Sequence, residues 1–246
     1  MSIPKIIHYC WFGGGPISEA DRKCMESWKK YCPDYKIIEW NEQNFEISAN
    51  RYAQQAYEAK KYAFVSDYVR LAVVYEYGGI YLDTDVELVR PLDELLELPG
   101  FMGFQNNNEV ATGLGFGACK GNPVVQALLR DYDALDFIKP DGSADLTPCP
   151  ERNTKVLQTL GVRVDGTRQS IAEMEIFPAE YFCPMDFYSR ELRVTPKTYS
   201  IHRYAESWKP KPSAVSRILQ RLLKKRYYTW YCPLRGRIEG RLRKRT

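Results

Sequence analysis

The sequence has no uninterrupted apolar run of about 18 residues, the length that a membrane-spanning helix requires. Its amino-terminal stretch, MSIPKIIHYCWFGGG, lacks the long apolar core of a secretory signal and has the character of a buried strand. The seven cysteines are odd in number and include no C-x-x-C pair, which favours reduced thiols over disulfides or zinc. We therefore expect a cytoplasmic protein.

What is present suits one large α/β domain. The chain has 246 residues, and 44% of them are hydrophobic, which is enough for a sizeable core. The pattern of apolar residues predicts strands at 5–11, 35–40, 80–82, 101–105 and 114–119, and helices at 20–31, 51–61, 63–77 and 122–135. Residues 136–151 are predicted to be a long irregular stretch, of the kind that often serves as a lid.

Basic charge is concentrated at the carboxyl end. Residues 213–246 contain eleven Lys and Arg against Glu239 alone, so they carry about +10 and the remainder about −6 of the net charge of +4. The preceding run Lys209-Pro210-Lys211-Pro212 marks a boundary, because alternating prolines break regular structure. We predict one domain at residues 1–212 and a separate basic segment at 213–246.

The basic segment has the pattern of an amphipathic helix. Its apolar residues follow helical spacing, and basic residues fill the opposite side. Such a helix, followed by the aromatic residues of 227–231, is typical of an anionic membrane surface. Packing of the apolar stripe on the main domain is one alternative. Nucleic-acid binding is another, but no recognisable motif supports it, so we expect no nucleic-acid partner.

The most informative motif is Asp83-Thr84-Asp85. It follows a helical pattern over residues 62–77, a glycine stop at Gly78 and a short hydrophobic strand. Side chains two residues apart on a strand point to the same face, so we expect the two carboxylates to converge. Paired carboxylates suit a divalent cation that also binds phosphates. The alternative interpretation is that both aspartates are solvated residues at the end of a strand and bind no cation.

Asp67 and Arg70 lie three positions apart on the preceding helix and are therefore neighbours on one face. As a surface ion pair they would contribute little to stability. In the same crevice as Asp83 and Asp85, however, the guanidinium group would match the oxygens of a diphosphate.

Three blocks of the sequence resemble one enzyme family. Residues 66–70 (SDYVR) and 77–85 (YGGIYLDTD) are similar to the sugar-binding region of D-x-D glycosyltransferases, most closely glycosyltransferase family 32. IPKIIHYCWFGG resembles the family's first strand, and Ile201-His202 with Ser207-Trp208 resembles its H…S-W element. The family includes bacterial capsule and lipopolysaccharide sugar transferases and yeast initiating mannosyltransferases, and is related to clostridial glucosylating toxins. The resemblance implies a GT-A-type α/β fold, a Rossmann-like mixed sheet flanked by helices, for the catalytic domain 1–212.

The resemblance also assigns site residues. It implies a nucleotide-sugar donor, a UDP-sugar, whose uracil stacks on Trp11, and a Mn²⁺ or Mg²⁺ cofactor. Expected donor contacts are Cys10, Trp11, Ser66, Asp67, Arg70, Tyr81, Asp83 and Trp208, with catalytic roles for Asp67, Arg70, Asp83 and Asp85. Expected metal ligands are Asp83, Asp85, His202 and Ser207, although Glu206 competes with the last two. Asn153 is expected to face the acceptor, and His8 is expected to be structural. Core roles for Trp11 and Tyr81 stay open.

The reaction implied is retaining transfer of a hexose or N-acetylhexosamine to a polyprenyl-diphosphate-linked saccharide, in bacterial capsule, lipopolysaccharide or exopolysaccharide synthesis. The enzyme would sit on the inner leaflet of the plasma membrane. We identify no carboxylate suited to be a covalent nucleophile, so we expect front-face attack by the acceptor. Two other functions stay open. Phosphatases of the haloacid dehalogenase type also use D-x-D, but have Thr or Val where this chain has Glu87; a non-enzymatic membrane-surface protein would act through residues 213–246.

Overall fold

The computed structural model describes residues 2–106, 108–187 and 189–205. The chain separates into two compact units, Met1–Pro184 with Arg193–Trp208, and Met185–Leu192 with Lys209–Thr246. All helices and strands named below belong to the first unit. Within the described residues, every helix is too short or too polar to cross a membrane. The predicted basic segment 213–246 and its boundary lie outside the described residues and stay a prediction.

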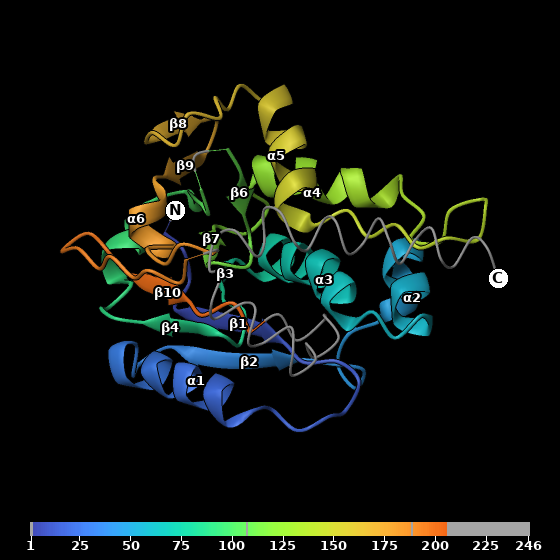
Figure 1. Ribbon diagram of the computed structural model, residues 1–246, viewed down its shortest axis with the longest axis horizontal. Helices are drawn as coiled ribbons and strands as arrows, with labels where there is room; N and C mark the ends of the chain where they lie inside the picture. Colours follow the sequence, from blue (N-terminus) through green and yellow to red (C-terminus); the bar gives the residue numbers. More distant parts are fainter. Residues whose placement is uncertain (1, 107, 188, 206–246) are drawn as a thin grey trace. The chain divides into compact units, whose positions relative to one another are not determined.

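A mixed sheet forms the centre of the first unit. The strands are β1 (Ile6–Cys10), β2 (Lys36–Trp40), β3 (Gly79–Tyr81), β4 (Val86–Leu88), β5 (Gly100–Phe104), β6 (Val110–Ala111), β7 (Phe116–Ala118), β8 (Gln169–Ile171), β9 (Met174–Phe177) and β10 (Ser200–His202). The eight-stranded sheet has the order β2-β1-β3-β7-β5-β9-β8, with β6 paired to β5 (Figure 1). β1 is parallel to β2 and β3, whereas β7 runs antiparallel between β3 and β5. β4 and β10 form a separate antiparallel pair.

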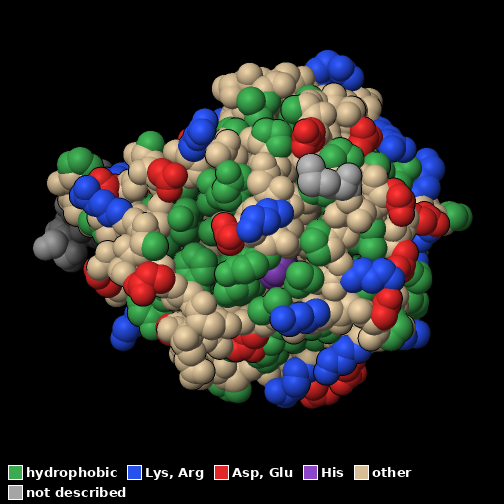
Figure 2. All heavy atoms as spheres, turned by 180° about the vertical axis from the view of Figure 1, so that it is seen from behind, with side chains coloured by type: hydrophobic (Ala, Val, Ile, Leu, Met, Phe, Trp, Pro, Cys, Tyr) green, Lys and Arg blue, Asp and Glu red, His purple; other side chains and the backbone are tan. Residues whose placement is uncertain are grey.

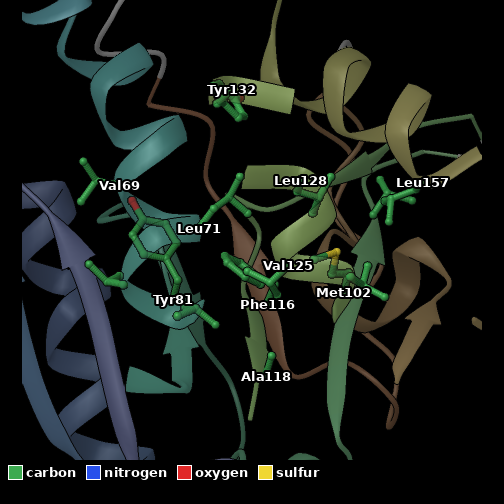
Figure 3. Packing of buried hydrophobic residues seen from close by; sticks show 14 of the residues in the cluster. Val69, Leu71, Tyr81, Met102, Phe116, Ala118, Val125, Leu128, Tyr132 and Leu157 are labelled. Carbon is green, nitrogen blue, oxygen red and sulfur yellow. The ribbon is translucent and has the colours of Figure 1, made fainter. Parts of the chain in front are cut away.

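Helices cover both faces of this sheet. They are α1 (Glu19–Tyr31), α2 (Arg51–Glu58), α3 (Tyr62–Tyr77), α4 (Pro123–Asp133), α5 (Cys149–Thr159) and α6 (Ala179–Phe182), with 3₁₀ turns η1 (Ile47–Ala49) and η2 (Asp93–Glu97). One buried cluster joins α2, α3, α4 and α5 to the sheet, and a second joins α1, η2 and α6 to it. Figure 3 shows the first cluster, where Leu71, Phe116 and Val125 meet. The predicted α/β class, a mixed sheet flanked by helices, is confirmed.

The helix ends follow local chemistry that the sequence shows. The side chains of Ser18, Asn50 and Asn122 accept hydrogen bonds from first-turn backbone N–H groups of α1, α2 and α4. Gly78 ends α3 with a φ of 67°, a conformation that glycine adopts without strain. The predicted helices and strands are confirmed, with ends shifted by up to a few residues.

The predicted irregular stretch 136–151 is partly wrong, because α5 begins inside it at Cys149. Pro148 precedes the helix and Pro150 lies in its first turn, where a missing N–H costs no helical hydrogen bond. The two prolines that indicated a loop therefore mark a helix start. Residues 136–148 do lack helix and strand, apart from an isolated bridge between Ile138 and Ala144.

His8 is a structural residue, as predicted. It is fully buried on β1, and its Nε2 lies 2.8 Å from the carbonyl oxygen of Gly78. Trp40 Nε1–H donates to Nδ1 of His8 at 3.0 Å. Because Nδ1 accepts, Nε2 must carry the proton and donate, which satisfies both nitrogens of a neutral imidazole.

We expect the free energy of unfolding to fall as the pH drops below 6.5, in part because of His8. Burial lowers the pKa of His8 below its usual 6.5, so at acidic pH the unfolded chain takes up a proton that the folded chain refuses. Urea unfolding at pH 7.5 and 5.5 measures the loss. A His8→Gln variant should be less stable but should show less of this pH dependence; equal pH dependence in both proteins would contradict the assignment.

Candidate active site

The two aspartates lie in a turn rather than on a strand. β3 ends at Tyr81, and Asp83-Thr84-Asp85 forms the connection to β4. The backbone N–H of Val86 donates to the carbonyl oxygen of Asp83 at 3.0 Å, which closes the turn. The predicted strand geometry was therefore wrong at these residues, but the side chains still converge. One oxygen of each carboxylate and one His202 nitrogen all lie within 4.8 Å of one another.

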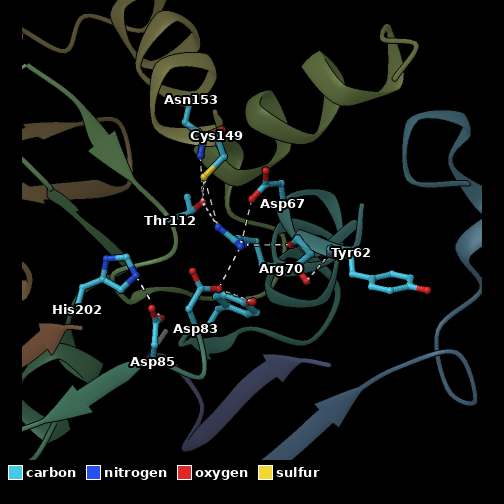
Figure 4. A network of polar contacts seen from close by, with 11 residues as sticks. Tyr62, Asp67, Arg70, Asp83, Asp85, Thr112, Cys149, Asn153 and His202 are labelled. Atoms are coloured by element: carbon cyan, nitrogen blue, oxygen red, sulfur yellow. Dashed lines mark hydrogen bonds and ion pairs between the residues drawn. The ribbon is translucent and has the colours of Figure 1, made fainter. Parts of the chain in front are cut away.

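Arg70 is the centre of a buried polar network (Figure 4). Its side chain is 5% exposed, and Nη2 lies 3.2 Å from Asp67 Oδ1 and 3.1 Å from Asp83 Oδ1. Nη1 donates to Thr112 Oγ1 at 3.5 Å and to Cys149 Sγ at 3.4 Å. The surface ion pair that the spacing allowed is thereby excluded. Burial raises the pKa of Asp67 to about 6, against the opposing effect of Arg70.

Asp83 is held from three sides. Its Oδ1 accepts from Arg70 Nη2 at 3.1 Å and from Tyr81 Oη at 2.9 Å. Gly113 closes the third side, since a Cβ atom there would overlap Asp83 Oδ2. Burial raises the pKa of Asp83, and Arg70 opposes that shift. The aspartate is thus fixed by Tyr81 of β3, by Arg70 of α3 and by the segment between β6 and β7.

Asp85 is bound by the carboxyl end of the described chain. β10 pairs with β4 so that His202 lies opposite Val86, and His202 Nε2 is 3.2 Å from Asp85 Oδ1. The backbone N–H of Ala205 donates to Asp85 Oδ2 at 2.7 Å. Burial disfavours the carboxylate, but His202 and these hydrogen bonds outweigh it and lower the pKa of Asp85 to about 2.

The donor atoms of this cluster fit a divalent cation. Two carboxylates and an imidazole nitrogen suit Mn²⁺, and the carboxylates also suit Mg²⁺. Nδ1 of His202 is buried and has no hydrogen-bond partner among the described residues, so within them the ring is not committed to a structural network on that side. The Asp85 carboxylate raises the pKa of His202, although burial opposes this shift. A cation bound at Nε2 of His202 would take the place of the proton on that nitrogen.

Of the predicted donor residues, Cys10 on β1 and Ser66 on α3 lie beside this network, and Trp11 directly follows β1. Cys10 is buried against Ser66 and Tyr81, and burial raises the pKa of its thiol to about 12. Trp11 is partly exposed, and its indole N–H donates to the carbonyl oxygen of Gly15 at 2.6 Å. Ser66 donates a side-chain hydrogen bond to the carbonyl oxygen of Tyr62 at 3.1 Å. These placements allow the predicted donor roles, which stay predictions.

The remaining predicted residues divide into two groups. Tyr81 is buried and binds Asp83 through its hydroxyl group. Asn153 is buried on α5, and its Nδ2 donates to Thr112 Oγ1 at 3.0 Å. Its Oδ1 has no partner in the part of the chain that the structure describes. Glu206, Ser207 and Trp208 lie outside the described residues, so their predicted roles stay predictions.

Sequence reasoning missed three residues of the network. Thr112 and Cys149 contact Arg70, and Gly113 gives Asp83 its space. The only signal in the sequence was the glycine-rich run 111–117 (ATGLGFG), because glycine recurs where backbone approaches another group closely. Cys149 had no such signal.

Figure 2 shows one face of the molecule, on which a histidine side chain is visible in a hollow bordered by hydrophobic and basic side chains.

The central part of the chain matches a family model. Residues 18–101 match the glycosyltransferase sugar-binding region containing a DXD motif. These residues are therefore similar to that sugar-binding region. The match includes Asp67, Arg70, Asp83 and Asp85, and the predicted resemblance to D-x-D glycosyltransferases is thereby confirmed.

Curated relatives of the DXD region are glycosyltransferases. The chain is 31% identical over 144 residues to inositol phosphoceramide mannosyltransferase 3 of Schizosaccharomyces pombe, covering 55% of this chain and 39% of that protein. It is 34% identical to the mannosyl phosphorylinositol ceramide synthase SUR1 of Saccharomyces cerevisiae (55% and 37% covered). It is 28% identical to human alpha-1,4-N-acetylglucosaminyltransferase (60% and 38% covered). The chain thus spans less than half the length of these relatives, and the family match and these names support a transferase.

Solved structures show more distant likenesses. The PaToxG glycosyltransferase is 21% identical, with a TM-score of 0.48 over 64% of this chain and 69% of that chain. A glycosyltransferase involved in glycosylation of the major capsid of PBCV-1 is 12% identical, with a TM-score of 0.47 over 83% of this chain and 95% of that chain. These likenesses concern the fold alone and identify no residue of the site.

Proposed function

We propose that this protein is a metal-dependent retaining glycosyltransferase that moves a hexose or N-acetylhexosamine from a nucleotide sugar, a UDP-sugar, to an acceptor hydroxyl. The observation that carries the proposal is the convergence of Asp83, Asp85 and His202 beside the Arg70 network, within a chain of which residues 18–101 are similar to a DXD sugar-binding region. Three potential metal-binding side chains and one buried guanidinium group suit a diphosphate leaving group.

Each side chain has a distinct role in this proposal. Asp83, Asp85 and His202 would hold Mn²⁺ or Mg²⁺, which when bound acts as a Lewis acid toward the diphosphate. Arg70 is positioned by Asp67 and Thr112, and its fixed charge would stabilise the departing nucleoside diphosphate without reorganisation.

The other predicted contacts would bind the ends of the two substrates. Trp11 and Cys10 would contact the base, and Asp67 would bind sugar hydroxyls, with its charge compensated by Arg70. The buried Oδ1 of Asn153 has no partner among the residues that the structure describes, which suits an incoming hydroxyl group of the acceptor.

The acceptor we propose is a saccharide linked to a membrane lipid, a polyprenyl diphosphate, in bacterial surface polysaccharide synthesis. One relative is named an inositol phosphoceramide mannosyltransferase and another a mannosyl phosphorylinositol ceramide synthase, which supports a lipid-linked acceptor as a class. We further propose that residues 213–246 bind the anionic inner leaflet, where such an acceptor would lie. The relatives named for their sugars differ between mannose and N-acetylglucosamine, so neither sugar is carried over to this chain.

The alternatives lack a supporting observation. A phosphatase of the haloacid dehalogenase type needs the first aspartate as a free nucleophile, whereas Asp83 Oδ1 is bound by Arg70 and Tyr81. A purely membrane-binding protein gives no reason for the buried network around Arg70.

The deciding experiment is nucleoside diphosphate release from a panel of UDP-sugars and GDP-mannose, with Mn²⁺, with Mg²⁺ and with EDTA, in the presence and absence of lipid-linked saccharides. We expect one donor to turn over only with metal, and the anomeric configuration of the product, read by NMR, to be retained. Metal-independent turnover, an inverted product or no turnover of any donor would refute the corresponding part of the proposal.

A further inference from the structure

A second hollow lies on the other side of α3. It has a volume of about 390 Å³, and residues of α3, α4 and the segment that follows β2 line it. Tyr68, Ala72 and Glu76 line it from α3 and follow one another at four-residue spacing. By helical periodicity they lie on the side of α3 opposite to Asp67 and Arg70. Its described lining residues include none of the Arg70 network and none of the cluster of Asp83, Asp85 and His202, so the hollow is separate from the candidate active site, and nothing above assigns it a role.

Aromatic rings form one wall of this hollow. Trp40 and Tyr77 stack with centroids 5.4 Å apart and an interplanar angle of 26°, and Phe45 meets Trp40 edge-on at 6.3 Å. Trp40 is buried and held by its hydrogen bond to His8, whereas Tyr77 is 50% exposed. The wall is thus a fixed aromatic platform whose outer ring reaches solvent. Such a ring offers a large apolar contact at little cost in conformational entropy.

The polar groups of the lining are two carboxylates, one amide and the hydroxyl groups of its tyrosines. Glu46, Glu76 and Asn44 line the hollow, and no Lys or Arg is among its described lining residues. A phosphate or another anion would find no cation there. Glu76 is already paired with Lys120 at 3.0 Å, which offsets one of the two negative charges and disfavours an organic cation.

We propose that this hollow is a binding site for a neutral saccharide. A pyranose ring has an apolar face of C–H groups, which would pack on Tyr77, and a rim of hydroxyl groups, which would donate to the carboxylates of Glu46 and Glu76. Concave sites of several hundred Å³ with aromatic walls and a few fixed polar groups are typical for small ligands. The proposal goes beyond the proposed transfer reaction, because the site would hold a sugar that is not being transferred.

The test measures binding of maltotriose, mannotriose and lactose to the full chain by saturation-transfer NMR and titration calorimetry. We expect at least one of them to bind, and the Tyr77→Ala variant to weaken its binding by about tenfold or more. Tyr77→Phe should retain binding within about threefold, because the ring remains. Tyr31→Ala, at the end of α1 and away from the hollow, is the matched control and should bind like the unmodified protein.

Two comparisons separate this site from the active site. Binding should persist in Asp85→Asn, and Tyr77→Ala should leave nucleoside diphosphate release without added saccharide unchanged. No binding of any of the three saccharides, equal binding by Tyr77→Ala, or loss of binding in Asp85→Asn would overturn the proposal. Displacement of the saccharide by choline would show a cation site instead and would overturn it as well.

Discussion

We expect the Arg70→Met variant to lose about 3 kcal/mol of its free energy of unfolding and nearly all transferase activity. Arg70 compensates Asp67 and Asp83, and breaking a buried ion pair by removing one partner costs about 3–5 kcal/mol. The lower end applies because the Asp83 side chain is 27% exposed and can draw on solvent. Activity should fall by about 10²–10³, since a fixed cation at the leaving group is lost.

Urea unfolding and donor turnover measure the two effects separately. Arg51→Met is the matched control: Arg51 is 74% exposed and pairs with Asp136 at 2.6 Å, so its loss should change stability by less than about 1 kcal/mol. Adding Asp67→Asn to Arg70→Met removes one of the uncompensated charges. This double variant should recover part of the stability and none of the activity. An Arg70→Met protein as stable as the Arg51→Met control would contradict the central role of this guanidinium group.

The α3 part of the site was predictable because its information is local. Three-residue spacing places Asp67 and Arg70 on one helical face whatever the rest of the chain does. Their burial was not predictable from that spacing, since it depends on Thr112 and Cys149, which approach from distant parts of the sequence. An ion pair on the surface and one at the centre of a buried network have the same three-residue spacing and differ only in the residues that pack against them.

The Asp83-Asp85 pair was predicted correctly in proximity but for the wrong reason. Strand alternation was expected to align the carboxylates, whereas a turn does so after β3 ends at Tyr81. Short strands followed by polar residues leave the last strand residue ambiguous, because strand and turn both fit such a pattern. The role of His202 came only through family resemblance. Its position depends on the pairing of β10 with β4, a non-local contact that no periodicity encodes.

The mixed sheet was predictable in class but not in order. Alternating strands and helices indicate α/β layers, and the core strands β1, β2, β3 and β5 were identified within two residues. The antiparallel placement of β7 between β3 and β5 depends on contacts between segments that are distant in the sequence. This strand order places Gly113 and Thr112, which precede β7, against Asp83 and Arg70. Topology, rather than local propensity, therefore completes the site.

Asp85→Asn should have the largest effect on metal binding. The pKa of Asp85 is lowered to about 2, so its side chain is a carboxylate at neutral pH. The Asp85→Asn variant therefore removes one full negative charge from the cluster. An amide can still accept the hydrogen bond from Ala205 N–H, and the turn should therefore persist. We expect Mn²⁺ affinity, measured by electron paramagnetic resonance titration, to fall by about 100-fold, and metal-dependent turnover to fall by at least as much.

Glu87→Gln supplies the matched control for this prediction. Glu87 lies two residues further along, on β4, and pairs with Arg203 at a partly exposed position. The Glu87→Gln variant removes one negative charge from the same chain segment but leaves the cluster of Asp83, Asp85 and His202 unchanged. Its Mn²⁺ affinity should therefore change by less than about threefold. If both variants weakened Mn²⁺ equally, the effect would be one of net charge. If Asp85→Asn bound Mn²⁺ normally, the cation would have to lie elsewhere, and the convergence of these three side chains would need another explanation.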